Sequence, residues 1–183
     1  MQSDAELMEA IRDGDDAAFR VLYERYKRAL YVFALRMLGE TDAARDLVQD
    51  VFMTVYQKQD QLQRPESFRS WLFAIGRNGC ISHLRRNRGR TALEDAPDEA
   101  VAVNTTGDQL RAAEKVRMIR RALSELKVEY REVIILREYQ NLSYREIADI
   151  TESTESAVKS KLFKARKALH EYLKPALAGR VQS

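Results

Sequence analysis

The sequence has a single cysteine, Cys80, among 183 residues, so it cannot form an intramolecular disulfide or a cysteine-based zinc site. Proline and glycine are also scarce, at three and seven residues, while alanine, leucine, arginine, lysine and glutamate are abundant. This composition disfavours a β-rich fold, which needs frequent turn residues. It predicts an all-helical protein.

Long apolar runs are missing as well. No stretch approaches the length of a membrane-spanning helix, and the N-terminal residues are acidic where a secretion signal is basic and then apolar. We therefore expect a cytoplasmic protein that does not insert into a membrane.

Signatures of catalysis are absent from the sequence too. His83 and His170 have no spaced metal-ligand partners, and there is no glycine-rich phosphate loop or evident nucleophile–base pair. We expect no metal, no cofactor and no enzymatic activity. Turnover of a nucleic acid by the pure protein with added metal ions would revive the hypothesis of an enzyme that acts on nucleic acid.

Positive charge is concentrated in two places, although the net charge is only +3. One basic run lies at Arg85–Arg90, and the other extends along Lys159–Lys174. Two separate basic patches suit a polyanion such as nucleic acid. A solvated helix face is the alternative for any run of charge.

The stretch 142–173 has the pattern of a helix-turn-helix. Ser143 and Glu146 form a capping box, which predicts a helix that begins at Tyr144. Residues 151–154 favour a turn because their side chains can bond to their own backbone. Ser153 or Thr154 then caps a second, basic helix. Its apolar residues are spaced as one buried stripe: Val158, Leu162, Ala165, Leu169 and Tyr172. This order of elements predicts a domain that reads a DNA major groove.

The first part of the chain predicts four more helices. A capping box at Ser3 opens the first helix, and Asp15 or Asp16 opens the second, which Gly39 ends. Thr41 is expected to cap the third helix. After a breaker segment at 60–67, the fourth helix runs from 68 and mixes aromatic with basic residues, a combination that suits single-stranded nucleic acid or a core helix with a basic outer face.

Residues 91–108 differ in composition from both sides, since they are acidic and hold Pro97 and Gly107. We interpret them as a flexible linker, because structureless loops of this length are uncommon inside one compact domain. The expected architecture is two small helical domains, at 1–90 and 109–183, with two further helices before the helix-turn-helix. Pro175 and Gly179 are expected to end the last helix.

Several blocks occur in an order that resembles an extracytoplasmic-function (ECF) sigma factor of the sigma-70 type. The blocks are DLVQDVF at 46–52, FRSWLFAIGRN at 68–78, HLRR at 83–86, REVIILREYQNLSYREIADI at 131–150 and AVKSKLFKARKAL at 157–169. The resemblance implies a first domain (region 2) that melts the minus-10 promoter element and a second domain (region 4) that reads the minus-35 element. It also implies a dissociable initiation factor with core RNA polymerase and promoter DNA as partners.

The resemblance assigns partner-binding residues to the third helix. Asp46, Gln49, Asp50 and Phe52 lie on the helix that, in the family, binds the clamp coiled coil of the polymerase beta-prime subunit; the beta subunit is a further partner. A polar face beside a buried anchor suits a basic partner surface, and a solvated face is the alternative. Family members are commonly inhibited by an anti-sigma factor, which could hold such a protein at the membrane.

The minus-10 residues expected by resemblance follow from the loop at 61–67 and the fourth helix. Asn78 matches a base-contacting residue, while Leu62 and Phe68 could give a flipped base apolar contact. Three arginines are expected on the phosphates: Arg77, Arg85 and Arg86. Gly76 and Gly79 are unusual inside a helix and either permit close approach of DNA or loosen the helix.

The minus-35 residues expected by resemblance lie in and around the second helix of the helix-turn-helix. Base readers are expected at Ser156, Lys159, Ser160 and Phe163, which point away from the apolar stripe or lie at the start of the helix. Phosphate contacts are expected from Lys164, Arg166, Arg137, Tyr144 and Arg145. The sequence departs from the family pattern at Glu152 and Ser156, where glycine is common, so we expect a strained turn.

A stand-alone helix-turn-helix regulator, with N-terminal helices that bind an effector or dimerise, is the main alternative. It explains the second half of the chain but not DLVQDVF or the aromatic–arginine helix. Such a regulator would not support transcription by an otherwise inactive core polymerase.

Overall fold

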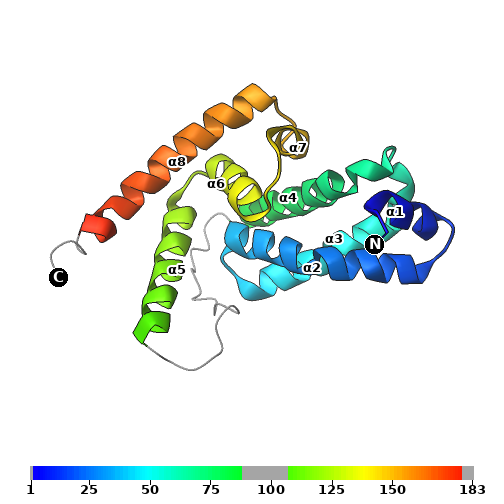
Figure 1. The fold of residues 1–183 in the computed structure, drawn as a ribbon, viewed down its shortest axis with the longest axis horizontal. Coiled ribbons are helices and arrows are strands. Elements are labelled where there is room, and N and C mark those ends of the chain that lie inside the picture. Colours follow the sequence, from blue (N-terminus) through cyan, green and yellow to red (C-terminus); the bar gives the residue numbers. More distant parts are fainter. Residues whose placement is uncertain (1, 88–106, 179–183) are drawn as a thin grey trace.

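The computed structural model describes residues 2–87 and 107–178, and all regular structure within these ranges is helical (Figure 1). This confirms the all-helical prediction. We call residues 2–87 the N-terminal half and residues 107–178 the C-terminal half. In Figure 1, α1 lies at one end of the molecule, α8 extends towards the other, and α7 lies beside α4.

The N-terminal half consists of α1 (Asp4–Arg12), α2 (Asp16–Leu38), α3 (Thr41–Gln57) and α4 (Phe68–Arg86). The long α2 packs against each of the other three helices. Its fully buried Phe33 meets Phe73 of α4 edge to face, with 5.7 Å between the ring centroids. The core of this half therefore forms around α2, and α3 and α4 present their outer faces for other contacts.

Capping residues in the sequence correctly predicted the starts of α1 and α2 and the end of α2. Ser3 caps α1 in a reciprocal capping box with Glu6, Asp15 caps α2, and Gly39 ends α2 in the left-handed conformation at φ 80°. The prediction for Thr41 is wrong. Glu40 occupies the cap position without a side-chain bond, and the Thr41 hydroxyl is buried with no hydrogen-bond partner.

The breaker segment forms two short 3₁₀ turns, Gln59–Gln61 and Pro65–Ser67. Arg12 of α1 ties the first turn down, because its guanidinium donates to the carbonyls of Gln59 and Leu62. The loop between α3 and α4 is thus held from beneath by the first helix.

The C-terminal half begins with α5 (Gly107–Glu125) and α6 (Val128–Ile134), followed by a π-helical turn, η3 (Ile135–Tyr139). It ends with α7 (Tyr144–Ile150) and α8 (Glu155–Ala178), which are the predicted helix-turn-helix. Two boundary predictions are wrong. Residues 107 and 108 already belong to α5 rather than to a linker, and α8 continues through Pro175. Residues 91–106 of the predicted linker, and Gly179, lie outside the described residues.

The two halves are in contact with each other. Helix α7 packs against α4, and α2 contacts η3, α5 and α6. The buried side chains of both halves form one hydrophobic cluster. The sequence predicts two domains but not this packing.

Candidate nucleic-acid and partner interfaces

The turn of the helix-turn-helix is built by its own polar side chains. The Thr151 hydroxyl donates to the Ile147 carbonyl at 2.7 Å, and the Thr154 hydroxyl accepts from the Ala157 N–H at 3.1 Å, so Thr154 caps α8. Between them, Glu152 adopts a left-handed backbone at φ 51°. The expected strain is therefore located at Glu152, a position that would suit glycine.

Helix α8 buries one stripe and leaves the opposite face in water. Val158, Leu162 and Ala165 are at most 1% exposed and pack towards α6 and α7. On the other face Phe163 is 72% exposed. The neighbouring predicted residues are exposed as well: Ser156, Lys159, Ser160, Lys164 and Arg166. The structure therefore brings the predicted base readers onto one accessible helix face.

A smaller cluster flanks this face around Tyr144, the first residue of α7. The Lys159 ammonium lies 5.7 Å from the Tyr144 ring centroid, and the Arg137 guanidinium lies 5.1 Å from it. Arg137 also donates to the Leu142 carbonyl at 2.7 Å, while Arg145 is exposed. Arg166 pairs with Glu138 at 2.7 Å, and this hydrogen bond raises the pKa of Arg166. The cluster places cations beside the predicted reading face.

The outer face of α3 is polar, as predicted. Asp46, Gln49 and Asp50 are all exposed, whereas Phe52 is only 4% exposed. The Phe52 ring packs edge-on against Tyr23 of α2, with 4.8 Å between the centroids. Phe52 therefore has the buried-anchor position expected beside a polar binding face.

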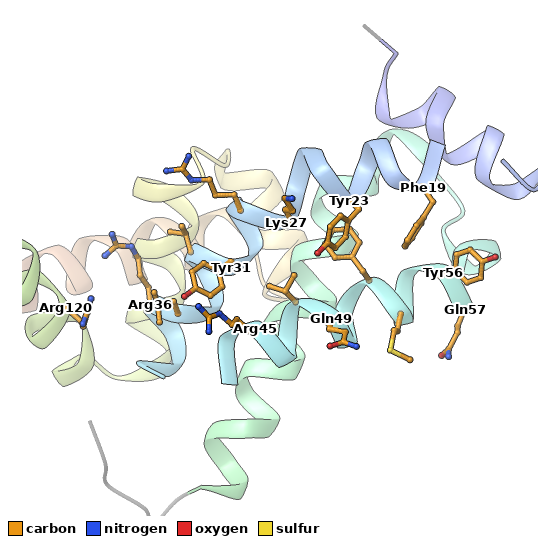
Figure 2. Close-up of a pocket in the computed structure, with 16 residues that line it drawn as sticks. Phe19, Tyr23, Lys27, Tyr31, Arg36, Arg45, Gln49, Tyr56, Gln57 and Arg120 are labelled. Carbon is orange, nitrogen blue, oxygen red and sulfur yellow. The ribbon is translucent and has the colours of Figure 1, made fainter. Parts of the chain in front are cut away.

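Helices α2 and α3 enclose a groove of about 1060 Å³, shown in Figure 2. We call it the α2/α3 groove. Its apolar lining comes largely from aromatic side chains, namely Phe19, Tyr23, Tyr31, Phe52 and Tyr56. Its basic rim comprises Lys27, Arg28, Arg36 and Arg45, with Arg120 from α5. The Tyr31 hydroxyl and the Arg36 Nε are buried and have no hydrogen-bond partner. Sequence reasoning missed this groove because its residues come from three helices.

The predicted minus-10 residues divide into exposed and buried groups. Asn78, Arg85 and Arg86 of α4 are exposed. By contrast, Leu62 is 5% exposed and Phe68 is fully buried against the rings of Tyr26 and Trp71. These two side chains form the floor beneath the loop rather than its surface, which differs from the expected direct contact with a base. The burial of Phe68 agrees with the helical spacing of the fourth helix, which puts this residue on the core face.

Arg77 is not free in this arrangement. Its Nε donates to the carboxylate of Glu132, on α6, at 2.8 Å, and Glu132 itself is 1% exposed. Sequence reasoning gave Glu132 no role, because it lies within an apolar block and 55 positions from Arg77. Burial and the charge of Glu132 raise the pKa of the nearby Cys80 thiol from 9.0 to about 12.

Among the described residues, no group of three or more histidine, cysteine or acidic side chains is placed to hold a metal ion. Within the same ranges, no helix combines the length and the apolar character needed to cross a membrane.

Comparison with known proteins places this fold in a family. The sigma-70 region 2 family matches residues 22–90, and the sigma-70 region 4 family matches residues 116–169. These matches define a sigma-70-type factor with both regions in order. The chain is 32% identical to the ECF RNA polymerase sigma factor SigL of Mycobacterium tuberculosis over 84% of this chain and 87% of that protein. The chain therefore belongs to the ECF sigma factors, which direct transcription initiation at specific promoters and are not enzymes.

Two solved structures have the same fold. CnrH, in complex with the cytosolic domain of CnrY, superposes with a TM-score of 0.76 at 25% identity and covers 95% of this chain and 99% of that one. The sigma factor RpoE in complex with the anti-sigma factor NepR, from Bartonella quintana, has a TM-score of 0.67 at 31% identity and covers 85% and 96%.

Proposed function

We propose that the chain divides promoter recognition between its halves. The N-terminal half binds core RNA polymerase and opens the minus-10 element, and the C-terminal half reads the minus-35 element. No covalent chemistry is required, because binding energy alone separates the strands.

Polymerase binding is assigned to α3. The exposed carboxylates of Asp46 and Asp50 suit a basic surface on the beta-prime clamp, and Gln49 adds a polar contact. Phe52 fixes the helix from below, and the groove beside it offers apolar area for a hot spot. The same helix, α3, is also assigned to contact with the beta subunit.

Minus-35 reading is assigned to the exposed face of α8. Phe163 is placed to contact a thymine methyl group, and Lys159 to donate to guanine acceptors, each contact being worth about 1–3 kcal/mol. Ser156 and Ser160 flank them at the start of the helix. The phosphates are met by Lys164, Arg166, Arg137, Tyr144 and Arg145, which position the duplex without reading its sequence.

Minus-10 melting is assigned to the loop before α4 and to α4 itself. Asn78 contacts a base, and Arg77, Arg85 and Arg86 hold the phosphates of the separated strand. Flipping a base costs a few kcal/mol of stacking, so the loop needs a rigid support. Leu62 and Phe68 provide that support from the core.

An anti-sigma factor is proposed as a further partner. Both related sigma factors named above were solved in complexes, and NepR is an anti-sigma factor. The α2/α3 groove, with its aromatic lining and basic rim, suits an amphipathic helix that carries acidic residues. The chain is proposed to act in the cytoplasm, where such a partner could also hold it at the membrane.

The observation that carries this proposal is that one chain presents both an exposed aromatic on a recognition helix and an exposed acidic face on α3. Charge reversal Asp50→Arg tests the second feature. We expect core-polymerase affinity to fall by about 2 kcal/mol, roughly thirtyfold. Fluorescence titration of labelled protein with core enzyme measures the change.

Glu9→Arg is the matched control, since Glu9 is exposed on α1 and also lies on a helix of the N-terminal half. It should leave core affinity unchanged. Equal affinity of Asp50→Arg and the unmodified chain would contradict the assignment of α3.

A further inference from the structure

Two residues from different halves of the chain form a nearly solvent-free ion pair. The Arg77 guanidinium on α4 reaches the Glu132 carboxylate on α6 through Nε at 2.8 Å and through Nη2 at 3.4 Å. The side chains are 17% and 2% exposed. This two-point contact has the geometry with which a guanidinium binds a carboxylate or a phosphate.

Further polar contacts join the halves around this pair. The side-chain amide of Gln140 donates to the backbone carbonyl of Ala29 at 3.1 Å. The backbone carbonyl of Gln140 accepts a hydrogen bond from the Arg69 guanidinium of α4. Arg131 donates to the Met37 carbonyl at 2.8 Å, while it also donates to the carbonyls of Leu123, Ser124 and Leu126 at the end of α5. The contacts are specific and connect α2 and α4 to the segment 131–140.

The contact between the halves covers part of the proposed DNA-binding surface on α4 and leaves the proposed polymerase-binding face of α3 exposed. Helix α7 packs along α4, and Arg77 is occupied, so α4 is partly covered. Asp46, Gln49 and Asp50 on α3 remain exposed. Core polymerase can therefore bind the closed chain, whereas a separated DNA strand meets Arg77 only after Glu132 has left it.

We propose that Glu132 acts as an internal substitute for a DNA phosphate and holds the free chain closed by occupying Arg77. DNA and Glu132 then compete for one guanidinium, and the halves must separate before the strand is bound. The proposal rests on the proposed function, in which Arg77 contacts the minus-10 strand. Opening returns both charged groups to water or to DNA, so neither is left buried and unpaired.

Distance measurement on the free protein tests the closed state. Spin labels on Lys58→Cys and Lys167→Cys, two exposed positions in different halves, are read by pulsed electron paramagnetic resonance in a Cys80→Ala background. We expect a narrow distance distribution for the parent protein and a broad one with a shifted mean for Glu132→Gln. Glu129→Gln removes an equal charge from the exposed side of α6 and should keep the narrow distribution. Far-UV circular dichroism confirms equal helix content.

Binding of a single-stranded minus-10 oligonucleotide, followed by fluorescence anisotropy, tests the competition. If nine in ten free molecules are closed, Glu132→Gln should bind about tenfold more tightly. Arg77→Gln should also open the chain, but it should not bind the oligonucleotide more tightly, because the guanidinium that contacts the strand is lost. An unchanged distance distribution in Glu132→Gln would overturn the proposal that Glu132 holds the chain closed. Opening without a gain in affinity over Glu129→Gln would overturn the competition and, with it, the assignment of Arg77 to DNA.

Discussion

Phe163 leaves a larger fraction of its surface in water, 72%, than any other exposed large hydrophobic side chain of the described residues. Burial of an aromatic ring normally contributes to stability, so this exposure gains nothing for the fold. It has a use only when another molecule covers the ring. Its position beside Lys159 on a basic helix supports the proposal that this molecule is DNA.

Phe163→Ala and Lys159→Ala should reduce discrimination between the preferred minus-35 sequence and a mutated one by about 1–3 kcal/mol each, without loss of folding stability. Electrophoretic mobility shift with both duplexes measures the difference. Lys174→Ala is the control, because it removes a charge about 22 Å further along the helix. Unchanged discrimination in the double variant would refute the assignment.

At the scale of single residues, helical spacing predicted exposed and buried positions, but it could not predict side-chain partners that are remote in the sequence. The exposure of Phe163 follows from its place opposite the stripe of Val158, Leu162 and Ala165. In the fourth helix the same spacing puts Phe68 on the core face, and Phe68 is fully buried, which differs from the base contact expected by resemblance. The partner of Arg77 could not be predicted, because Glu132 is remote in sequence.

Among the helices, α4 approaches α2 and α3 closely because of two glycines. A Cβ atom at Gly76 would lie 2.8 Å from Leu30 Cδ1, and one at Gly79 would lie 2.4 Å from Leu47 Cδ1. The sequence suggested two roles for these glycines, close approach of DNA and a loosened helix. Neither role accounts for this packing. The glycines allow helices, rather than DNA, to come near.

Gly76→Ala should destabilise the protein more than Gly79→Ala. Both changes gain about 1 kcal/mol of helix propensity. Leu30 is fully buried and cannot move away, so overpacking at Gly76 should cost about 1–3 kcal/mol, whereas Leu47 is 9% exposed and can turn its tip outward. Urea denaturation gives both free energies of unfolding. The reverse order of stabilities would show that the packing around α4 is misassigned.

Helix boundaries could be predicted wherever a cap is formed by neighbouring residues, as at Ser3, Asp15 and Ser143. They could not be predicted where tertiary packing decides. Thr41 loses its expected cap role to Glu40, and α8 runs through Pro175. Hydrogen bonds between neighbouring residues can be predicted from the local sequence. Where tertiary packing overrides a local preference for a cap or a helix end, contacts elsewhere in the fold offset the cost in stability.

For the molecule as a whole, the sequence predicts two halves with separate tasks, and the structure adds that they close on each other. The closed arrangement depends on pairs such as Gln140 with Ala29 and Arg131 with Met37, which no periodic pattern reveals. A chain that must contact two promoter elements needs its halves to part. In the proposed competition between Glu132 and DNA, this closed arrangement opens when the strand binds Arg77.

Run-off transcription with core RNA polymerase on genomic DNA tests the central claim most directly. We predict that the added protein produces discrete transcripts, whose start sites share two upstream sequence blocks at a fixed spacing, and that Asp50→Arg abolishes them. Transcripts no more specific than those of core enzyme alone, from protein that still binds duplex DNA, would contradict the account and favour a stand-alone regulator.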